Sequence, residues 1–203
     1  MSKNTKRKIE QETPNALYNW WTFPEYVDSQ ICKKIIDYGK DNWIEAVITD
    51  DARTTSELNK KVRDTQVVWC NEKWIYDLVW NYLHTANQNA FWNFQIDSCE
   101  AMQIGKYGKG GHYEFHQDGN GFTRELSNNK HTHNKTRKIS MTILLNDDYE
   151  GGEFEFFSNK EELIKGKTGT VIVFPSYQVH RVRPVTKGVR YSLVVWFCGE
   201  PFQ

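Results

Sequence analysis

The stretch YGKGGHYEFHQD, at residues 107–118 of a chain of 203, carries the first informative pattern of this sequence. A glycine-rich turn leads into an extended segment that ends at His116. In an extended chain, residues i and i+2 point to the same face, so His116 and Asp118 present an imidazole and a carboxylate together. The glycines lack the GK[ST] pattern of a phosphate loop. The stretch therefore predicts a strand whose end carries two potential metal ligands.

A second histidine stands in FPSYQVHRV, residues 174–182, which is predicted as a strand, a turn and a second strand carrying His180. Two histidines and one carboxylate, leaving coordination positions open, form the facial arrangement of non-haem Fe(II) oxygenases. An isolated His-x-Asp pair is weak evidence for a metal, but a distant third ligand completes the set. We predict His116, Asp118 and His180 as metal ligands and catalytic centre.

Ten residues after His180, Arg190 and Ser192 form another i, i+2 pair on one face of an apolar strand. A guanidinium grips a carboxylate with two parallel hydrogen bonds, and a hydroxyl adds a third. A buried arginine without an acidic partner is costly, so Arg190 is expected to meet an anionic ligand.

These motifs resemble those of the Fe(II)- and 2-oxoglutarate-dependent oxygenases, and within them the prolyl 4-hydroxylase-like branch. The resembling stretch runs from about Met102 to Trp196. It includes ISMTILLNDDYEGGEFEFF at residues 139–157 and VIVFPSYQVHRVRPVTKGVRYSLVVW at residues 171–196. The combination of H-x-D, Gly-Gly-Glu, Pro-Ser…His-x-Val and Val-x-x-Gly-x-Arg is specific. One departure is that many collagen-type prolyl hydroxylases have lysine where this chain has Arg190.

The resemblance implies a role for each matching residue. The metal ligands would hold iron, Arg190 would bind the distal carboxylate of 2-oxoglutarate, and Arg137 would face the substrate. The remaining cofactor-binding positions that it implies are Tyr107 and Ser192, beside that carboxylate, and Tyr113 and Trp196, the aromatic positions near iron and cosubstrate.

The implied reaction consumes 2-oxoglutarate and O2 at Fe(II), with ascorbate as a reductant, and releases succinate and CO2. The implied substrate is a proline-containing peptide or protein, hydroxylated at C4 of the prolyl residue. Free proline, another amino acid or a small metabolite stays open. Two other classes are also open: a zinc-dependent hydrolase using the same ligands, and a non-catalytic cupin-like sensor that binds a small acid.

Periodicity separates the chain into a helical and a β-rich part. Helical spacing of apolar residues predicts helices at about 24–38 and 72–90, whereas from residue 91 onward the period changes to two. Strands are predicted at 91–96, 100–107, 138–145, 153–157, 170–174 and 190–197. The pattern predicts a mostly β sandwich or barrel with supporting helices outside. The resemblance sharpens this to a double-stranded β-helix, a jelly-roll, cupin-like core with the N-terminal helices packed outside.

Domain organisation is predicted to be simple. Residues 1–12 read as a disordered basic terminus and residues 13–203 as one oxygenase domain. Residues 119–138 are polar and asparagine-rich, and we expect a loop that acts as a lid over the site.

Charge and hydropathy exclude several classes of protein. The 26 Lys and Arg residues balance the 26 Asp and Glu residues, so the chain lacks the basic excess that is typical of a general nucleic-acid binder. No apolar run reaches the roughly 20 residues that span a bilayer. The first ten residues, MSKNTKRKIE, show no apolar signal-peptide segment, so a cytoplasmic protein without membrane partners is expected. Four scattered cysteines are expected to be free thiols.

Overall fold

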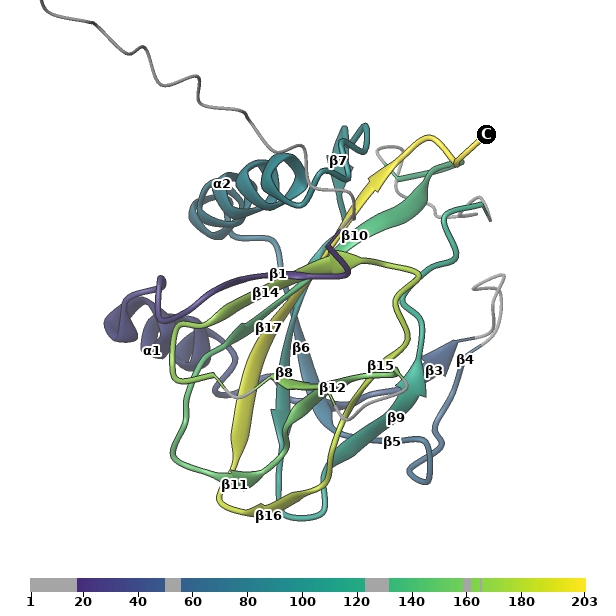
Figure 1. Ribbon diagram of the computed structural model, residues 1–203. Coiled ribbons are helices and arrows are strands. Elements are labelled where there is room, and N and C mark those ends of the chain that lie inside the picture. Colours follow the sequence, from purple (N-terminus) through teal and green to yellow (C-terminus); the bar gives the residue numbers. More distant parts are fainter. Residues whose placement is uncertain (1–17, 50–55, 123–131, 159–161, 165) are drawn as a thin grey trace, which may run out of the picture.

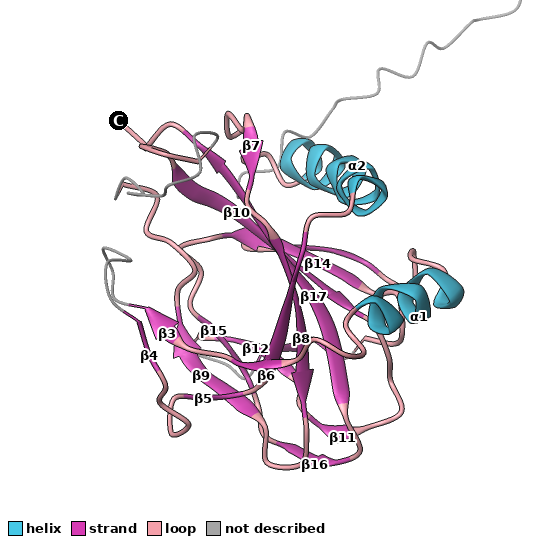
Figure 2. Cartoon of the chain, turned by 180° about the vertical axis from the view of Figure 1, so that it is seen from behind, coloured by secondary structure: helices cyan, strands magenta, loops and turns pink. Residues whose placement is uncertain are grey.

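Two facing antiparallel sheets form the body of the protein, and two helices cover the outer face of the larger sheet (Figures 1 and 2). The computed structural model describes residues 18–49, 56–122, 132–158, 162–164 and 166–203. The expected basic terminus at residues 1–12 lies outside this described part. The elements, in chain order, are β1 (Trp21–Phe23), α1 (Ser29–Tyr38), β2 (Ile44–Glu45), β3 (Ile48–Thr49), β4 (Ser56–Glu57), β5 (Arg63–Asp64), β6 (Gln66–Cys70), α2 (Lys73–Asn89), β7 (Ser98–Cys99), β8 (Met102–Tyr107), β9 (His112–His116), β10 (Thr136–Leu144), β11 (Glu150–Gly151), β12 (Phe154–Phe156), β13 (Glu162–Ile164), β14 (Val171–Pro175), β15 (His180–Val182), β16 (Val185–Lys187) and β17 (Arg190–Gly199).

Within the described residues, the larger sheet has eight strands in the order β1-β14-β10-β17-β8-β6-β2, with β7 beside β17. The smaller sheet has five strands in the order β13-β12-β15-β9-β5. Apart from β12 and β13, neighbours in these orders are not consecutive in the sequence, and the strand pairs run antiparallel. This is the mostly β, double-stranded β-helix architecture that the sequence predicted.

Side chains alternate between the two faces of β17, so this one strand contributes both to the core under the helices and to the space between the sheets. Leu193, Val195 and Phe197 are fully buried in the cluster that packs against the helices. Arg190 and Ser192 are equally buried, but they stand on the opposite face, toward the smaller sheet. A strand buried on both faces reads as a near-continuous apolar run, and the two polar residues mark where the inner face becomes a site.

The helices are amphipathic and bury one stripe each. Helix α1 buries Cys32 and Ile35, and α2 buries residues at the spacing of one face. The Asp28 side chain accepts a hydrogen bond of 2.7 Å from the backbone N–H of Gln30 and so caps α1. Helix α1 therefore begins at Ser29, not at residue 24 as the periodicity predicted. Residues 21–23 instead pair with β14 as strand β1.

Two further expectations differ in detail from the structure. Residues 91–96 form no strand, because Phe91 and Asn93 have positive φ angles of 59° and 50°, which break an extended run. The Asn87 side chain also bonds both backbone groups of Phe94, in place of a strand partner. The expected loop at 119–138 ends earlier than predicted, since residues 136–138 belong to β10. Its middle, residues 123–131, lies outside the described residues.

The four cysteines are free thiols, as expected. In the part of the chain that the structure describes, no helix is both long enough and apolar enough to cross a membrane.

Candidate active site

Two adjacent strands of the smaller sheet bring the three predicted metal ligands together. His116 at the end of β9 pairs directly with His180 at the start of β15, and Asp118 follows two residues after His116. The Nε2 atoms of both histidines lie 3.7 Å from the Asp118 carboxylate oxygens. One ligand atom from each residue falls within 4.8 Å of the others. The three side chains thus converge on one point, as a metal site requires.

Backbone hydrogen bonds set which ring nitrogen of each histidine is available. The Nδ1 atom of His116 lies 2.7 Å from the carbonyl of Glu114, and that of His180 lies 2.9 Å from the carbonyl of Gln178. A carbonyl oxygen only accepts, so each Nδ1 carries the proton and donates it. The two Nε2 atoms are therefore lone-pair acceptors directed at the shared point.

The charge states of two ligands also suit a metal. Burial, reinforced by the neighbouring His180, lowers the pKa of His116 to about 3, so its imidazole is neutral. Burial raises the pKa of Asp118, but His180, His116 and Arg137 together outweigh it and lower the value to about 2. A neutral imidazole beside an ionised carboxylate is the state in which these groups bind metal ions.

Arg190 is the largest fully buried side chain of the described residues, with no exposed surface. Its Nη1 donates a hydrogen bond of 3.0 Å to the Ser192 hydroxyl, and its guanidinium lies 5.1 Å from the centre of the Tyr107 ring. Its Nε and Nη2 have no hydrogen-bond partner among the described residues. Because leaving those donors unpaired is costly, the buried guanidinium has the chemistry to receive an anion.

The structure places the other predicted residues around the same space. Tyr107 is opposite Arg190 in the strand register, and Tyr113 stacks on the ring of His116 with centroids 3.5 Å apart. Trp196 is buried and its indole N–H has no partner among the described side chains. Together with the ligands, they line a cavity of about 320 Å³ between the two sheets.

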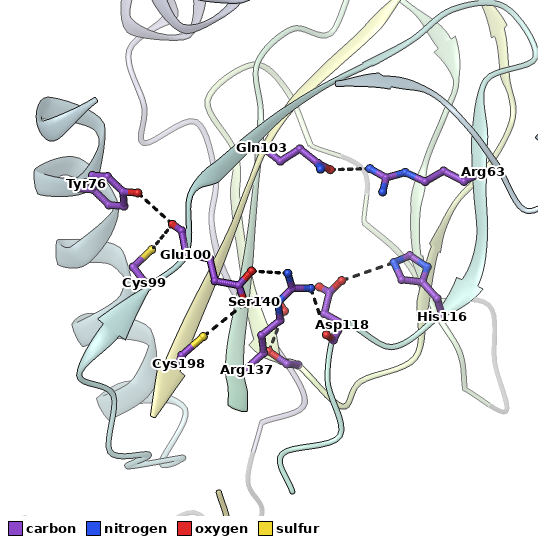
Figure 3. A network of polar contacts seen from close by, with 11 residues as sticks. Arg63, Tyr76, Cys99, Glu100, Gln103, His116, Asp118, Arg137, Ser140 and Cys198 are labelled. Carbon is purple, nitrogen blue, oxygen red and sulfur yellow. Dashed lines mark hydrogen bonds and ion pairs between the residues drawn. The ribbon is translucent and has the colours of Figure 1, made fainter. Parts of the chain in front are cut away.

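Arg137, predicted to face the substrate, also lines this cavity, but its guanidinium is already engaged. Nε and Nη2 donate to the two carboxylate oxygens of Glu100 at 2.6 and 2.5 Å, and Nη1 donates to the Asp118 carbonyl at 3.3 Å (Figure 3). Its Cζ atom lies 3.8 Å from the centre of the Trp196 ring. Although burial opposes the charged form, Glu100 raises the pKa of Arg137 further. Arg137 therefore braces the segment that carries a metal ligand.

Sequence reasoning missed four residues that line the cavity or hold one of its lining residues in place. Arg63 on β5 and Gln103 on β8 line it and bind each other, and Trp69 stands at its edge. Glu100, which holds Arg137, was missed as well. A two-residue strand such as β5 shows no periodicity, so no signal in the sequence marks Arg63.

Two histidines and one aspartate lie between the sheets of a double-stranded β-helix and beside a buried arginine, in an arrangement that could hold a metal ion next to an acid. Residues 102–198 match the family model described as the 2OG-Fe(II) oxygenase superfamily. The matched stretch covers nearly half of the chain and contains His116, Asp118, His180 and Arg190. The resemblance predicted from the motifs is thereby confirmed.

Curated relatives carry a more specific name. A "PKHD-type hydroxylase" of Stenotrophomonas maltophilia is 37% identical over 97 residues, which cover 46% of this chain and 41% of the relative. Another, from Synechococcus sp. strain CC9311, is 32% identical over 124 residues, covering 56% of this chain and 52% of the relative. The chain therefore spans about half or less of the length of these relatives.

Solved structures share the fold over most of the chain. A prolyl-4-hydroxylase of Pseudomonas putida has a TM-score of 0.64 at 18% identity, covering 88% of this chain and 91% of that one. The viral collagen prolyl hydroxylase of Paramecium Bursaria Chlorella virus-1 also has a TM-score of 0.64, at 19% identity, covering 90% and 97%. At these identities the likeness establishes the fold and nothing further.

Proposed function

We propose that this protein is an Fe(II)- and 2-oxoglutarate-dependent oxygenase that hydroxylates an unactivated C–H bond. The observation that carries the proposal is the buried guanidinium of Arg190, which has two unpartnered N–H groups and opens into the same cavity as the metal ligands. A hydrolytic metal site has no need for such an anion receptor. A 2-oxo acid does, because its distal carboxylate must be held away from the metal.

Each group of the cavity has a part in this reaction. His116, Asp118 and His180 hold the metal, while Arg190, Ser192 and Tyr107 bind the distal carboxylate of 2-oxoglutarate. The donor set of two imidazoles and one carboxylate, together with the unpartnered guanidinium, fits this pair. Bound there, iron with 2-oxoglutarate and O2 supplies the oxidising power that breaks the C–H bond.

The protein's own contribution is positioning and exclusion of water. Phe154, Phe156 and Phe174 surround the His180 ring with centroids 5.2, 6.5 and 4.7 Å away. This aromatic wall fixes the imidazole and keeps bulk water from one side of the site. The backbone acceptors on both Nδ1 atoms hold the ligand tautomers, so the metal meets a preorganised set.

For the substrate we propose a prolyl residue in a peptide or protein, hydroxylated at C4, with succinate and CO2 as coproducts. Support comes from the names of the relatives and neighbours. One of these is a prolyl hydroxylase from Trichoplax adhaerens in complex with a peptide fragment, with a TM-score of 0.62 and 16% identity. Ascorbate serves in the proposal as the reductant that restores Fe(II) after unproductive turnover.

The test measures succinate formed from 2-oxoglutarate, together with the gain of one oxygen atom in a library of proline-containing peptides, by mass spectrometry. We expect succinate to require iron and O2, and to be stoichiometric with hydroxylated peptide. His116→Ala and Asp118→Ala should abolish both products. Full activity of either variant would contradict the ligand assignment.

The same assay separates the two other classes. A zinc hydrolase would turn over substrate without O2 and without succinate. A cupin-like sensor would bind 2-oxoglutarate and form no succinate with any peptide.

A further inference from the structure

Unpartnered donors concentrate in the cavity. Among the described residues, the buried side-chain polar atoms without a hydrogen-bond partner are Nε of Arg63, Nε and Nη2 of Arg190 and Nε1 of Trp196. All three residues line the cavity. Every one of these atoms is an N–H donor, and a buried donor left unpaired costs about 1–3 kcal/mol. The cavity is therefore built for ligands that bring hydrogen-bond acceptors to more than one place.

The side chains of Arg63 and Arg190 are found at different levels along the strands of the larger sheet. Arg190 lies in the strand register opposite Tyr107, whereas Arg63 binds Gln103, whose register partner is Val194. Four residues of extended chain separate these two levels of the sheet, which corresponds to about 13 Å. A 2-oxoglutarate molecule held by Arg190 and the metal would thus leave the Nε of Arg63 without an acceptor.

Arg63 is held in place by a neutral side chain and an aromatic ring, and not by an ion pair with a carboxylate. Its Nη2 donates to Gln103 at 2.5 Å, across the gap between the two sheets (Figure 3), and its guanidinium lies 4.6 Å from the centre of the Tyr113 ring. Asp64, the next residue on β5, and Glu45, which also lines the cavity, both pair with Lys60. No carboxylate of the described residues lies within 4.0 Å of Arg63.

The charges of the cavity also indicate that Arg63 meets an anionic group. Arg137 is neutralised by Glu100, and Glu45, the other carboxylate of the lining, is neutralised by Lys60, which leaves Arg63 and Arg190 against the carboxylate of Asp118. A divalent metal and the dianion of 2-oxoglutarate cancel each other. One positive charge then remains in the loaded cavity, and it resides at Arg63. A low-dielectric cavity with one uncompensated cation attracts an anionic partner.

We propose that Arg63 binds a carboxylate of the molecule that is oxidised, so that the substrate is an acid with an apolar body. Ile44, Val47 and Trp69 also line the cavity and are 55%, 43% and 45% exposed, which offers the apolar body a surface. The inference rests on the proposed function in taking this molecule as the substrate. The carboxylate has two sources: the terminal carboxylate of a small acid, or an acidic side chain beside the target residue of a peptide.

The experiment compares matched pairs of probes that differ in charge alone. Protein loaded with Mn(II) and 2-oxoglutarate is titrated by calorimetry with the N-acetyl derivatives of the common amino acids, each as free acid and as primary amide. A second arm uses X-Pro-Y peptides with amidated ends that carry either Glu or Gln at X or Y. We expect wild type to prefer acids over amides, or Glu over Gln, by at least about tenfold, the order of one charge-assisted hydrogen bond.

Three variants accompany the wild type. Arg63→Gln should reduce the preference to less than about threefold, and Arg63→Lys, which keeps the charge and loses the fork, should retain part of it. Arg181→Gln is the matched control, because Arg181 pairs with Glu155 and does not line the cavity. Its preference should equal that of wild type. The proposal is overturned if wild type shows no acid preference up to millimolar probe, or if both Arg63 variants keep the wild-type ratio.

Failure of this inference is distinguishable from failure of the proposed function. Substrate-independent succinate formation with Fe(II) by the wild type tests the function, and we expect the control Arg181→Gln, which lies outside the cavity, to leave it within about twofold of wild type. Loss of succinate formation in wild type would refute the oxygenase proposal, while the binding ratios measured with Mn(II) would still report on Arg63.

Discussion

We expect Arg190 to lower the stability of the ligand-free protein and to strengthen its binding of 2-oxoglutarate. Its guanidinium is fully buried and keeps two donors unpaired, a state that destabilises the ligand-free protein. We expect Arg190→Met to raise the free energy of unfolding of the ligand-free protein by about 1–3 kcal/mol. The same change should weaken binding of 2-oxoglutarate by at least about 100-fold, because charge-assisted hydrogen bonds are lost. Urea unfolding and calorimetric titration measure the two effects.

Ser192→Ala is the control for Arg190→Met, since it removes a single hydrogen bond to Nη1 and leaves the charge. It should weaken 2-oxoglutarate several-fold at most. Mn(II) affinity should be unchanged in both variants. A destabilised Arg190→Met protein that binds 2-oxoglutarate normally would show that the guanidinium is a structural group.

Glu100 is a second residue whose importance comes from its partner. It holds Arg137 with two hydrogen bonds, and the side chains are 17% and 12% exposed. Removing one member of a buried pair leaves an uncompensated charge, so Glu100→Gln should destabilise the protein by about 3 kcal/mol. Because Arg137 also bonds the Asp118 carbonyl, Mn(II) affinity should fall as well. Denaturant unfolding with a fluorescence readout, and Mn(II) titration, test this; unchanged stability would contradict the bracing role.

At the scale of elements, Gly152 joins β11 to β12 behind Arg190. Its φ is +64°, and a Cβ would lie 2.9 Å from Val185 Cγ2 and 3.0 Å from Arg190 Cδ. Gly152→Ala should therefore cost about 1–2 kcal/mol in backbone strain and displace the arginine, weakening 2-oxoglutarate. Gly108→Ala is the matched control, since a Cβ there meets nothing within 4 Å. Equal 2-oxoglutarate affinities for the two variants would argue against this packing role.

Glu155 links two strands of the smaller sheet on the face away from the cavity. Hydrogen bonds from Arg183 and then Arg181, at 2.7 and 2.6 Å, outweigh burial and hold the pKa of Glu155 below its ordinary value of 4.5. A lowered native pKa gives stability that is present above about pH 4.5 and is lost as pH falls through the native value. Glu155→Gln should cost about 1–3 kcal/mol near neutral pH, and the difference from wild type should shrink in acid. Urea unfolding across that pH range measures it, and a pH-independent difference would contradict it.

The β-rich half was predictable because its strands alternate or run apolar between glycine-rich turns. Residues 138–145 and 190–197 correspond closely to β10 and β17. The i, i+2 rule also placed the His116–Asp118 pair and the Arg190–Ser192 pair correctly, since it depends only on the local geometry of a strand. These are the parts of the fold that sequence pattern determines.

What the sequence could not show depends on contacts between strands that are distant along the chain. The three arginines that follow His180 in the sequence have different surroundings in the structure: Arg181 and Arg183 pair with Glu155, and of the three only Arg190 lines the cavity. The pairing of Arg63 with Gln103 follows from the register of β6 on β8 and of β5 on β9, which no local period encodes.

For the molecule as a whole, a metal bound between neighbouring strands of the smaller sheet should stabilise the folded state. His116 and His180 lie on neighbouring strands, and a metal joining them with Asp118 binds the native state alone. Mn(II) at about 100 times its dissociation constant should add about 2.7 kcal/mol. For a protein of this size that corresponds to a rise in Tm of roughly 5–10 °C. A chelator should reverse the shift, and His116→Ala should remove it.

Mn(II) and 2-oxoglutarate should each stabilise the folded protein, and each should do so through different side chains of the same cavity. In Arg190→Met the Mn(II) shift in Tm should remain and the further shift caused by 2-oxoglutarate should disappear, whereas in His116→Ala the Mn(II) shift should be the one lost. Thermal unfolding followed by circular dichroism gives the Tm of each variant without additions, with Mn(II) alone, with 2-oxoglutarate alone and with both. If Mn(II) stabilises His116→Ala as much as wild type, the metal binds elsewhere, and the cavity between the two sheets is not the metal centre.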